Sequence, residues 1–170
     1  MTRRRSSTHD FELYVDGASK GNPGHAGVGV VICREGKPAA SLSRYIGTVT
    51  NNVAEYMALL YGLQEALIMK AARLVVHTDS ELMYRQLTHQ YKVRHPAIAV
   101  LYQQAVRLCQ AFEKVSIRHI PREQNREADR LATQAVREAL KQGVKHVRQG
   151  LTSDLISDHH RESPQVSFDF

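Results

Sequence analysis

The order of strand-like and helix-like segments constrains the fold of this chain more than any other feature of its sequence. Three short strand-like runs, residues 11–16, 26–33 and 39–47, come first and are joined by short turns. Strands joined in this way pair as antiparallel neighbours. Helices and strands alternate in the rest of the chain: helices over residues 52–70 and 80–87, a helix opened by Pro96, a helix over 125–141, and strands over 74–78 and 115–120.

An antiparallel meander followed by alternating helices and strands predicts the α/β class, with a five-stranded mixed sheet flanked by helices. The segment 52–70 carries apolar residues at helical spacing, and the run LVVHT at 74–78 is typical of a buried strand. We therefore expect one domain over residues 11–141. The ends, residues 1–10 and 142–170, are expected to be flexible.

Four acidic residues lie near the ends of these elements. Asp16 ends the first predicted strand, and Asp79 ends the fourth. A parallel pairing of those strands through a right-handed crossover brings both carboxylates to the carboxyl edge of the sheet, where open α/β sheets bind ligands. Glu55, early in the helix over 52–70, and Asp129, one turn into the last helix, can reach the same edge. The four positions predict a carboxylate cluster.

Such a cluster needs cations to hold it together. Oxygen ligands select Mg²⁺ or Mn²⁺, and two ions about 4 Å apart can activate a water and stabilise a leaving oxygen. Taken singly, each acid has a structural interpretation: Asp79 as a helix cap, Glu55 in a capping box, Asp129 as a solvated helix residue, Asp16 in an ordinary turn. Their joint occurrence favours the metal site.

The charge distribution favours a polyanionic partner. The net charge is +6, and residues 149–170 contribute −3, which leaves +9 on residues 1–148. No apolar run reaches the roughly 20 residues that span a bilayer, and no signal peptide is recognisable. Cys33 and Cys109 stand too far apart for a metal knuckle and form no disulfide framework. We expect a cytoplasmic protein without a membrane contact.

Four runs in this order resemble ribonuclease H type 1 over residues 11–141: YVDGASKGNPGHAGVGVVI, TNNVAEYMALLYGLQEAL, VVHTDSELMYRQL and HIPREQNREADRLATQAV. The resemblance implies a sheet of strand order 3-2-1-4-5 with helices on both faces. It implies that Asp16, Glu55, Asp79 and Asp129 bind the catalytic metal ions. It also implies a substrate-contacting set: Gly17, Asn22, Thr50, Asn51, Asn52 and Ser80.

The activity implied by the resemblance is hydrolysis of the RNA strand of an RNA–DNA hybrid by a monomeric endonuclease. Two Mg²⁺ or Mn²⁺ ions would take part, leaving 3′-hydroxyl and 5′-phosphate ends. Double-stranded RNA is a further candidate substrate. The alternative is a weakly active or inactive module of the same fold that binds hybrid or double-stranded RNA. An integrase-like core and a 3′ exonuclease are rival functions, and the presence of all four carboxylates favours the enzyme.

The chain departs from the family in two places. Many members carry a basic protrusion that grips the DNA strand, whereas only the short segment HQYKVRH, residues 89–95, joins two helices here. Lys92 and Arg94 either compensate in part or belong to a solvated loop. The second departure concerns a mobile histidine. His119 falls at its position in an ungapped count but inside a predicted strand, so a shortened loop with Arg122 or Glu123 in that role is the favoured interpretation.

The last six residues, 165–170, are similar to bacterial sliding-clamp-binding peptides. Gln165 is followed by Phe168 and Phe170. Such a peptide would insert its aromatic side chains into an apolar pocket of the clamp after a flexible tether. This hypothesis connects the nuclease with DNA replication or repair, and a frayed or self-docked terminus is the alternative.

Overall fold

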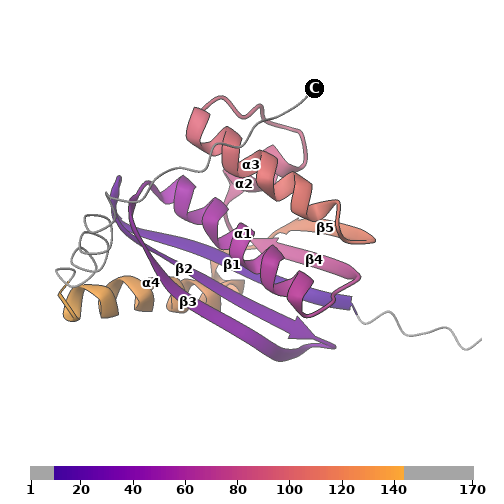
Figure 1. The fold of residues 1–170 in the computed structure, drawn as a ribbon, viewed down its shortest axis with the longest axis horizontal. Helices are drawn as coiled ribbons and strands as arrows, with labels where there is room; N and C mark the ends of the chain where they lie inside the picture. Colours follow the sequence, from indigo (N-terminus) through magenta and orange to yellow (C-terminus); the bar gives the residue numbers. More distant parts are fainter. Residues whose placement is uncertain (1–9, 144–170) are drawn as a thin grey trace, which may run out of the picture.

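The computed structural model describes residues 10–143. The sheet has the order β3-β2-β1-β4-β5, which confirms the predicted order, and Figure 1 shows how the helices surround it. The predicted flexible ends lie almost wholly outside the described residues, and the clamp-binding hypothesis for residues 165–170 lies entirely outside them. The elements in chain order are β1 (Asp10–Gly21), β2 (Gly24–Arg34), β3 (Lys37–Val49), α1 (Asn51–Ile68), β4 (Arg73–Thr78), α2 (Glu81–Leu87), α3 (Pro96–Cys109), β5 (Lys114–His119), a 3-10 turn η1 (Arg122–Gln124) and α4 (Arg126–Lys141).

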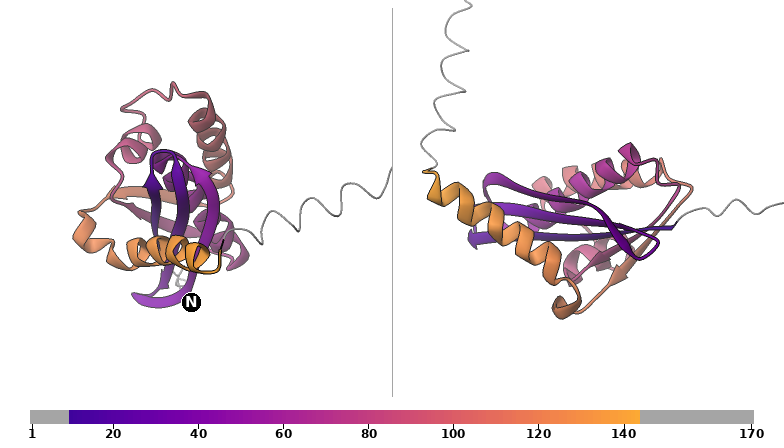
Figure 2. Two further views of the ribbon diagram at one scale, coloured as in Figure 1. Left: turned by 90° about the vertical axis from the view of Figure 1, so that its left-hand side faces the viewer. Right: turned by 90° about the horizontal axis from the view of Figure 1, so that it is seen from below.

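Helices cover both faces of the sheet. The first three strands are antiparallel neighbours, and β4 and β5 then add in parallel on the other side of β1. α1 lies over β1 and β2 with α3 beside it, and α4 crosses the opposite face over β1, β2 and β3 (Figures 1 and 2). The mixed sheet with helices on both faces is therefore as predicted.

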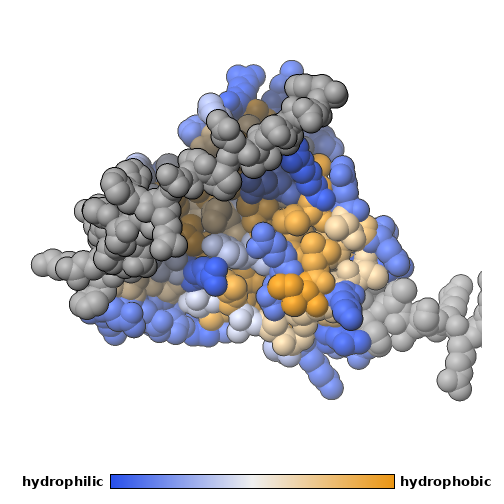
Figure 3. Space-filling model, viewed as in Figure 1, coloured by the Kyte–Doolittle hydropathy of each residue, from blue (hydrophilic) through white to orange (hydrophobic). Residues whose placement is uncertain are grey.

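The main core lies between α1 and the sheet. Its largest fully buried side chains come from β1, β2, α1, β4 and α2: Leu13, Ile32, Tyr56, Leu59, Leu63, Leu74 and Met83. Each such side chain contributes roughly 1.5–3 kcal/mol by leaving water. In Figure 3, hydrophobic residues also gather on the surface over the second half of α1, where Ile68 is 72% exposed. The core holds α1 against β1, with the first turns of the helix beside Gly17.

Strand β1 is longer than the sequence predicts. The expected end at Asp16 is wrong, because residues 17–21 stay in the ladder with β2, from Gly17 opposite Val28 to Gly21 opposite Gly24. The turn is thereby reduced to Asn22 and its neighbour. The local pattern of a glycine-rich segment favours a turn, although glycine is equally suited to a strand that another backbone approaches closely.

None of the helices in the described part of the chain combines the length and apolarity needed to cross a membrane. Cys33 and Cys109 are both free thiols.

Two glycines of β2 let α4 lie very close to the sheet. A Cβ atom on Gly29 would come within 1.9 Å of the carbonyl oxygen of Ala128, and one on Gly27 within 2.5 Å of that of Ala132. Such separations are far below van der Waals contact, so these positions admit no side chain unless the helix moves. The glycines thereby set the distance between α4 and the sheet, and with it the position of the residues on the first turns of the helix.

We expect Gly29→Ala to lower the free energy of unfolding by about 1–3 kcal/mol, because the added methyl group overpacks the contact with α4. Urea denaturation monitored by circular dichroism measures the change. Ser41→Ala on β3, an exposed position, is the control and should change stability by less than about 0.5 kcal/mol. Equal stability of the two variants would contradict the close contact.

Candidate metal centre and catalytic pocket

Three carboxylates come together just beyond the point where the parallel pairing of β1 with β4 ends. Asp16 lies on β1, Glu55 on α1, and Asp79 directly after β4. One oxygen from each lies within 4.8 Å of the others. Asp16 and Glu55 are buried and Asp79 is half-buried. Three of the four acidic residues singled out in the sequence thus form one group that could hold a metal ion.

The parallel pairing of β1 with β4 aligns Asp16 with Asp79. The last paired residues are Tyr14 and His77, so each aspartate stands two residues beyond this pair and on the same face as its member of the pair. The rings of Tyr14 and His77 stack with their centroids 4.4 Å apart. This stacked pair marks the end of the paired region, two residues before each of the two carboxylates.

Glu55 reaches the cluster because α1 packs directly on β1. Thr50 caps the helix by accepting a hydrogen bond from the N–H of Val53 at 3.3 Å. The helix therefore begins at Asn51, one residue earlier than predicted. The N–H of Gly17 donates to Glu55 Oε2 at 3.2 Å, and a Cβ atom on Gly17 would come within 2.3 Å of the backbone of α1. Gly17 thus holds the carboxylate of Glu55 in place.

The cluster is electrostatically strained in the absence of cations. Burial, followed by the negative charges of Asp79 and Asp129, raises the pKa of Asp16 to about 8. Burial and then the charge of Asp16 raise the pKa of Glu55 well above its usual value. Desolvated carboxylates that repel one another ionise together only if a positive charge enters the site. The arrangement is chemically that of a binding site for a hard cation.

Asn125 is a site residue that the sequence pattern identifies only as the start of the last helix. Its side chain is 1% exposed. The Nδ2 group donates to the carbonyl oxygen of Val15 at 2.9 Å and to Asp79 Oδ1 at 3.2 Å. Asn125 therefore connects β1, Asp79 and the start of α4. Its position before a helix resembles an ordinary cap, and no local pattern distinguishes that role from a contact across the sheet.

Asp129 lies beside the cluster rather than among its three closest members. Its negative charge contributes to the raised pKa of Asp16, and its Oδ1 accepts a hydrogen bond from Arg122 Nη2 at 2.8 Å. The side chain of Arg122 is 75% exposed. The guanidinium thus partly neutralises the open side of the carboxylate group.

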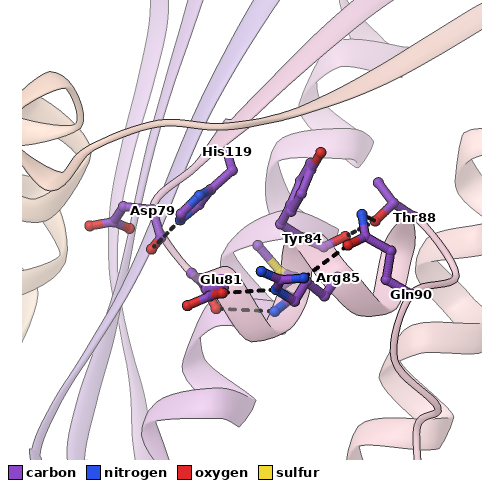
Figure 4. Close-up of polar contacts among 9 residues, drawn as sticks. Asp79, Glu81, Tyr84, Arg85, Thr88, Gln90 and His119 are labelled. Carbon is purple, nitrogen blue, oxygen red and sulfur yellow. Dashed lines mark hydrogen bonds and ion pairs between the residues drawn. The ribbon is translucent and has the colours of Figure 1, made fainter.

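His119 and Arg122 both face the site. His119 is the last residue of β5, and its Nε2 lies 3.3 Å from the main-chain oxygen of Asp79. Its ring stacks on Tyr84 of α2 with 5.6 Å between the centroids, as Figure 4 shows. Glu123, the other residue considered for the mobile-histidine position, is exposed on η1 and does not line the described pocket around the carboxylates.

The pocket around these carboxylates has a volume of about 780 Å³ and is open to solvent. We call it the catalytic pocket. It is formed by the ends of β1, β4 and β5 together with the first turns of α1, α2 and α4. Its residues are Asp16, Gly17, Ala18, Ser19, Asn51, Glu55, Asp79, Ser80, Glu81, His119, Ile120, Pro121, Arg122, Asp129 and Thr133.

The predicted substrate-contacting residues divide into two groups. Gly17, Asn51 and Ser80 line the catalytic pocket. Ser80 also caps α2 by accepting from the N–H of Met83 at 3.3 Å. Thr50, Asn22 and Asn52 stand at its margin: Thr50 is the cap of α1, the N–H of Asn51 donates to Asn22 Oδ1 at 3.2 Å, and Asn52 is exposed.

The segment between α2 and α3 is connected to the margin of the pocket. Arg85 bonds to Glu81 at 2.8 Å and to Gln90 at 3.0 Å (Figure 4). Its guanidinium also lies over the ring of Tyr91. The neighbouring cations Lys92 and Arg94 are exposed. This short segment is thus braced against α2 and presents positive charge to solvent.

Comparison with known proteins assigns relatives to this architecture. A family model described as "Reverse transcriptase-like" matches residues 14–135. The "Bifunctional protein Rv2228c" of Mycobacterium tuberculosis is 40% identical over 126 residues, which cover 73% of this chain and 35% of that protein. The chain therefore spans about a third of the length of this relative.

Solved structures agree with the sequence matches. The RNase H1 of Halobacterium salinarum is 37% identical with a TM-score of 0.75, covering 76% of this chain and 99% of that one. LC11-RNase H1, from a compost metagenome, was solved in complex with an RNA/DNA hybrid. That structure is 39% identical with a TM-score of 0.73, covering 76% of this chain and 99% of that one.

We expect Asp16→Asn to stabilise the metal-free protein at pH 8. The carboxyl of Asp16 has a pKa of about 8 in the folded chain against 3.8 ordinarily. A raised pKa means that the unfolded chain releases this proton first, so stability falls as pH rises from about 4 to about 8. The variant escapes this loss, and at pH 8 it should gain at least about 1.4 kcal/mol, the equivalent of one pKa unit.

Thermal or urea unfolding at pH 4 and pH 8 measures this difference. Glu123→Gln makes the same change of charge on an exposed side chain and should show no comparable gain. Millimolar Mg²⁺ should reduce the stability difference between Asp16→Asn and wild type at pH 8, because a ligand that binds the folded wild type stabilises it. If Asp16→Asn were less stable than wild type at pH 8 without metal, the proposed repulsion between Asp16 and its neighbouring carboxylates would be refuted.

Proposed function

The chain belongs to the ribonuclease H type 1 family, and we propose that it hydrolyses the RNA strand of RNA–DNA hybrids as a metal-dependent endonuclease. The observation that carries the proposal is the group of three carboxylates within 4.8 Å of one another at the end of the parallel strands. The family match over residues 14–135 supports it, as does a relative of the same fold solved with an RNA/DNA hybrid.

The residues of the site fit Mg²⁺ or Mn²⁺. The donors are carboxylate oxygens, which these hard cations prefer, and the raised pKa values of Asp16 and Glu55 are those of groups that a cation would ionise. We propose Asp16, Glu55, Asp79 and Asp129 as the ligands. Two such ions, when bound, supply activation of the attacking water and stabilisation of the leaving 3′ oxygen.

The protein's own groups would hold this arrangement rigid. Asn125 fixes one oxygen of Asp79, and the N–H of Gly17 fixes one oxygen of Glu55. Attack of water on the phosphorus with departure of the 3′ oxygen leaves 5′-phosphate and 3′-hydroxyl ends. We propose cleavage within the strand, because the catalytic pocket is open to solvent and can admit a continuous strand.

Recognition of RNA is assigned to the polar groups around the start of α1. Asn51 lines the catalytic pocket, and its N–H is bound to Asn22 of the β1–β2 turn. Amide side chains of this kind can bond to 2′-hydroxyls and phosphates, which distinguish RNA from DNA without reading bases. We propose Lys92 and Arg94 as contacts to the DNA strand, in place of the missing basic protrusion.

The first experiment is cleavage of an end-labelled RNA–DNA hybrid with Mg²⁺ or Mn²⁺. We expect internal cuts confined to the RNA, lost on chelation. Asp16→Asn removes a ligand charge and should lower the rate by at least about 10³-fold, whereas Glu123→Gln should retain it. Double-stranded RNA and double-stranded DNA are run in parallel.

The possible outcomes separate the candidate activities. A wild-type protein that binds hybrid in a gel shift without cutting it would identify a binding module. A ladder shortened from one end would identify an exonuclease. Cuts retained in Asp16→Asn would remove the carboxylate group from the mechanism.

We propose Arg122, rather than His119, as the mobile cationic group beside the scissile phosphate. Arg122 is largely exposed and its guanidinium reaches Asp129, whereas His119 is held between the Asp79 main chain and Tyr84. Removal of a charged group that stabilises the transition state costs about 10²-fold in rate. We therefore expect Arg122→Ala to lower kcat by that factor and His119→Ala to lower it by less than about tenfold.

Arg126→Ala, at an exposed position of α4, is the matched control for loss of an arginine and should leave kcat unchanged. The pH profile adds a second criterion, because arginine stays charged where histidine titrates near neutral pH. A larger loss in His119→Ala than in Arg122→Ala would reverse the assignment.

A further inference from the structure

A second groove opens beside the catalytic pocket, between the far end of β1 and one side of α4. We call it the α4 groove. Its volume is about 610 Å³, and it shares Ala18, Ser19 and Thr133 with the catalytic pocket, so the two are adjacent. It is lined by Ala18, Ser19, Lys20, Thr133, Val136, Arg137, Leu140 and Lys141.

The charged residues of the α4 groove are all basic. Lys20 stands on the β1 side, and Arg137 and Lys141 stand on the α4 side. All three are exposed, and none forms an ion pair with a carboxylate within residues 10–143. Arg130, on a neighbouring side of the same helix, is by contrast bound to Glu127 at 2.6 Å. The groove thus keeps three cations free for an anionic partner.

The basic residues of α4 continue a line that starts at the metal centre. Asp129, Thr133, Arg137 and Lys141 follow one another at intervals of four and therefore share one side of the helix. At 1.5 Å per residue, Arg137 lies about 12 Å and Lys141 about 18 Å beyond Asp129 along the axis. One nucleic-acid strand carries a phosphate about every 3.4 Å of its helix axis. The line therefore spans about five nucleotides.

We propose that the α4 groove binds the sugar–phosphate backbone of the RNA strand on one side of the scissile phosphate; this inference rests on the proposed function. Arg137, Lys141 and Lys20 contact phosphates from the two sides of the groove. Leu140, which is half-buried, offers an apolar surface to the sugars between them. Contacts to the backbone alone carry no base preference. The groove would add substrate contacts in a chain that lacks the family's basic protrusion.

The test compares two double charge reversals in the full-length protein. Arg137→Glu/Lys141→Glu alters the α4 groove. Lys37→Glu/Lys114→Glu changes the net charge equally at two exposed first residues of strands, at the end of the sheet opposite the carboxylates. Circular dichroism establishes that both variants fold. Lys20→Glu alters the other side of the groove independently.

On a hybrid of about 20 base pairs, we expect Arg137→Glu/Lys141→Glu to raise KM at least tenfold over the control while kcat changes less than about twofold. The slope of log Kd against log salt should fall in magnitude by about 1.4–1.8, since each of the two lost phosphate contacts removes about 0.7–0.9. Lys20→Glu should raise KM in the same direction. Two further hybrids have their RNA strand truncated on the 5′ side or on the 3′ side of the cut. The rise in KM caused by Arg137→Glu/Lys141→Glu should persist with one truncated hybrid and disappear with the other.

Several results would overturn the proposal. If both double variants match in KM and salt slope while wild type still cuts hybrid, the α4 groove is no RNA site and the proposed function stands. If wild type neither binds nor cuts hybrid, the proposed function and the proposal for the α4 groove are both wrong. A KM penalty that emerges only after deletion of residues 144–170 would assign the groove to that segment. A wild-type dimer that Arg137→Glu/Lys141→Glu converts to a monomer would assign it to a second copy of the chain.

Discussion

The parallel pairing of β1 with β4 sets the position of nearly every group in the site. It carries the two strands in register to Tyr14 and His77, whose stacked rings end the paired region, and so delivers Asp16 and Asp79 side by side at the same level. The helices that follow each strand must start at this edge. Glu55, Ser80 and Asn125 therefore come from helix starts that the sheet has already placed next to the aspartates.

The close approach of helices to the sheet allows so many like charges to be held together. Glycines at positions 17 and 29 let the backbones of α1 and α4 come within contact distance of the strands. The carboxylates are thereby desolvated and brought near one another, which raises the pKa of Asp16 and of Glu55. Packing energy from the core offsets this repulsion in the metal-free chain, and a bound cation would relieve it. The same carboxylate cluster thus lowers the stability of the metal-free chain and provides the ligands for a cation.

The elements of the fold were predictable because their periodicities are local. Helices α1, α3 and α4 and strands β4 and β5 lie where apolar spacing places them, within a few residues. The end of β1 was not predictable, since the composition of residues 17–21 is typical of a turn until β2 is known to pair with them. The role of Asn125 was missed for a related reason. Its hydrogen bonds to Val15 and Asp79 join residues 110 and 46 positions away, and a local pattern contains neither partner.

The sequence by itself determined the class of the fold, the order of its elements and the four acidic residues, because these depend on residue type and on spacing along the chain. The tertiary structure alone decided which acids meet. Asp16, Glu55 and Asp79 form the tight group, while Asp129 stays beside it with Arg122. It also decided that Lys20 of β1 faces Arg137 and Lys141 of α4 across one groove. Distances between residues of different elements follow from how closely the backbones pack, and this is a property of the folded molecule as a whole.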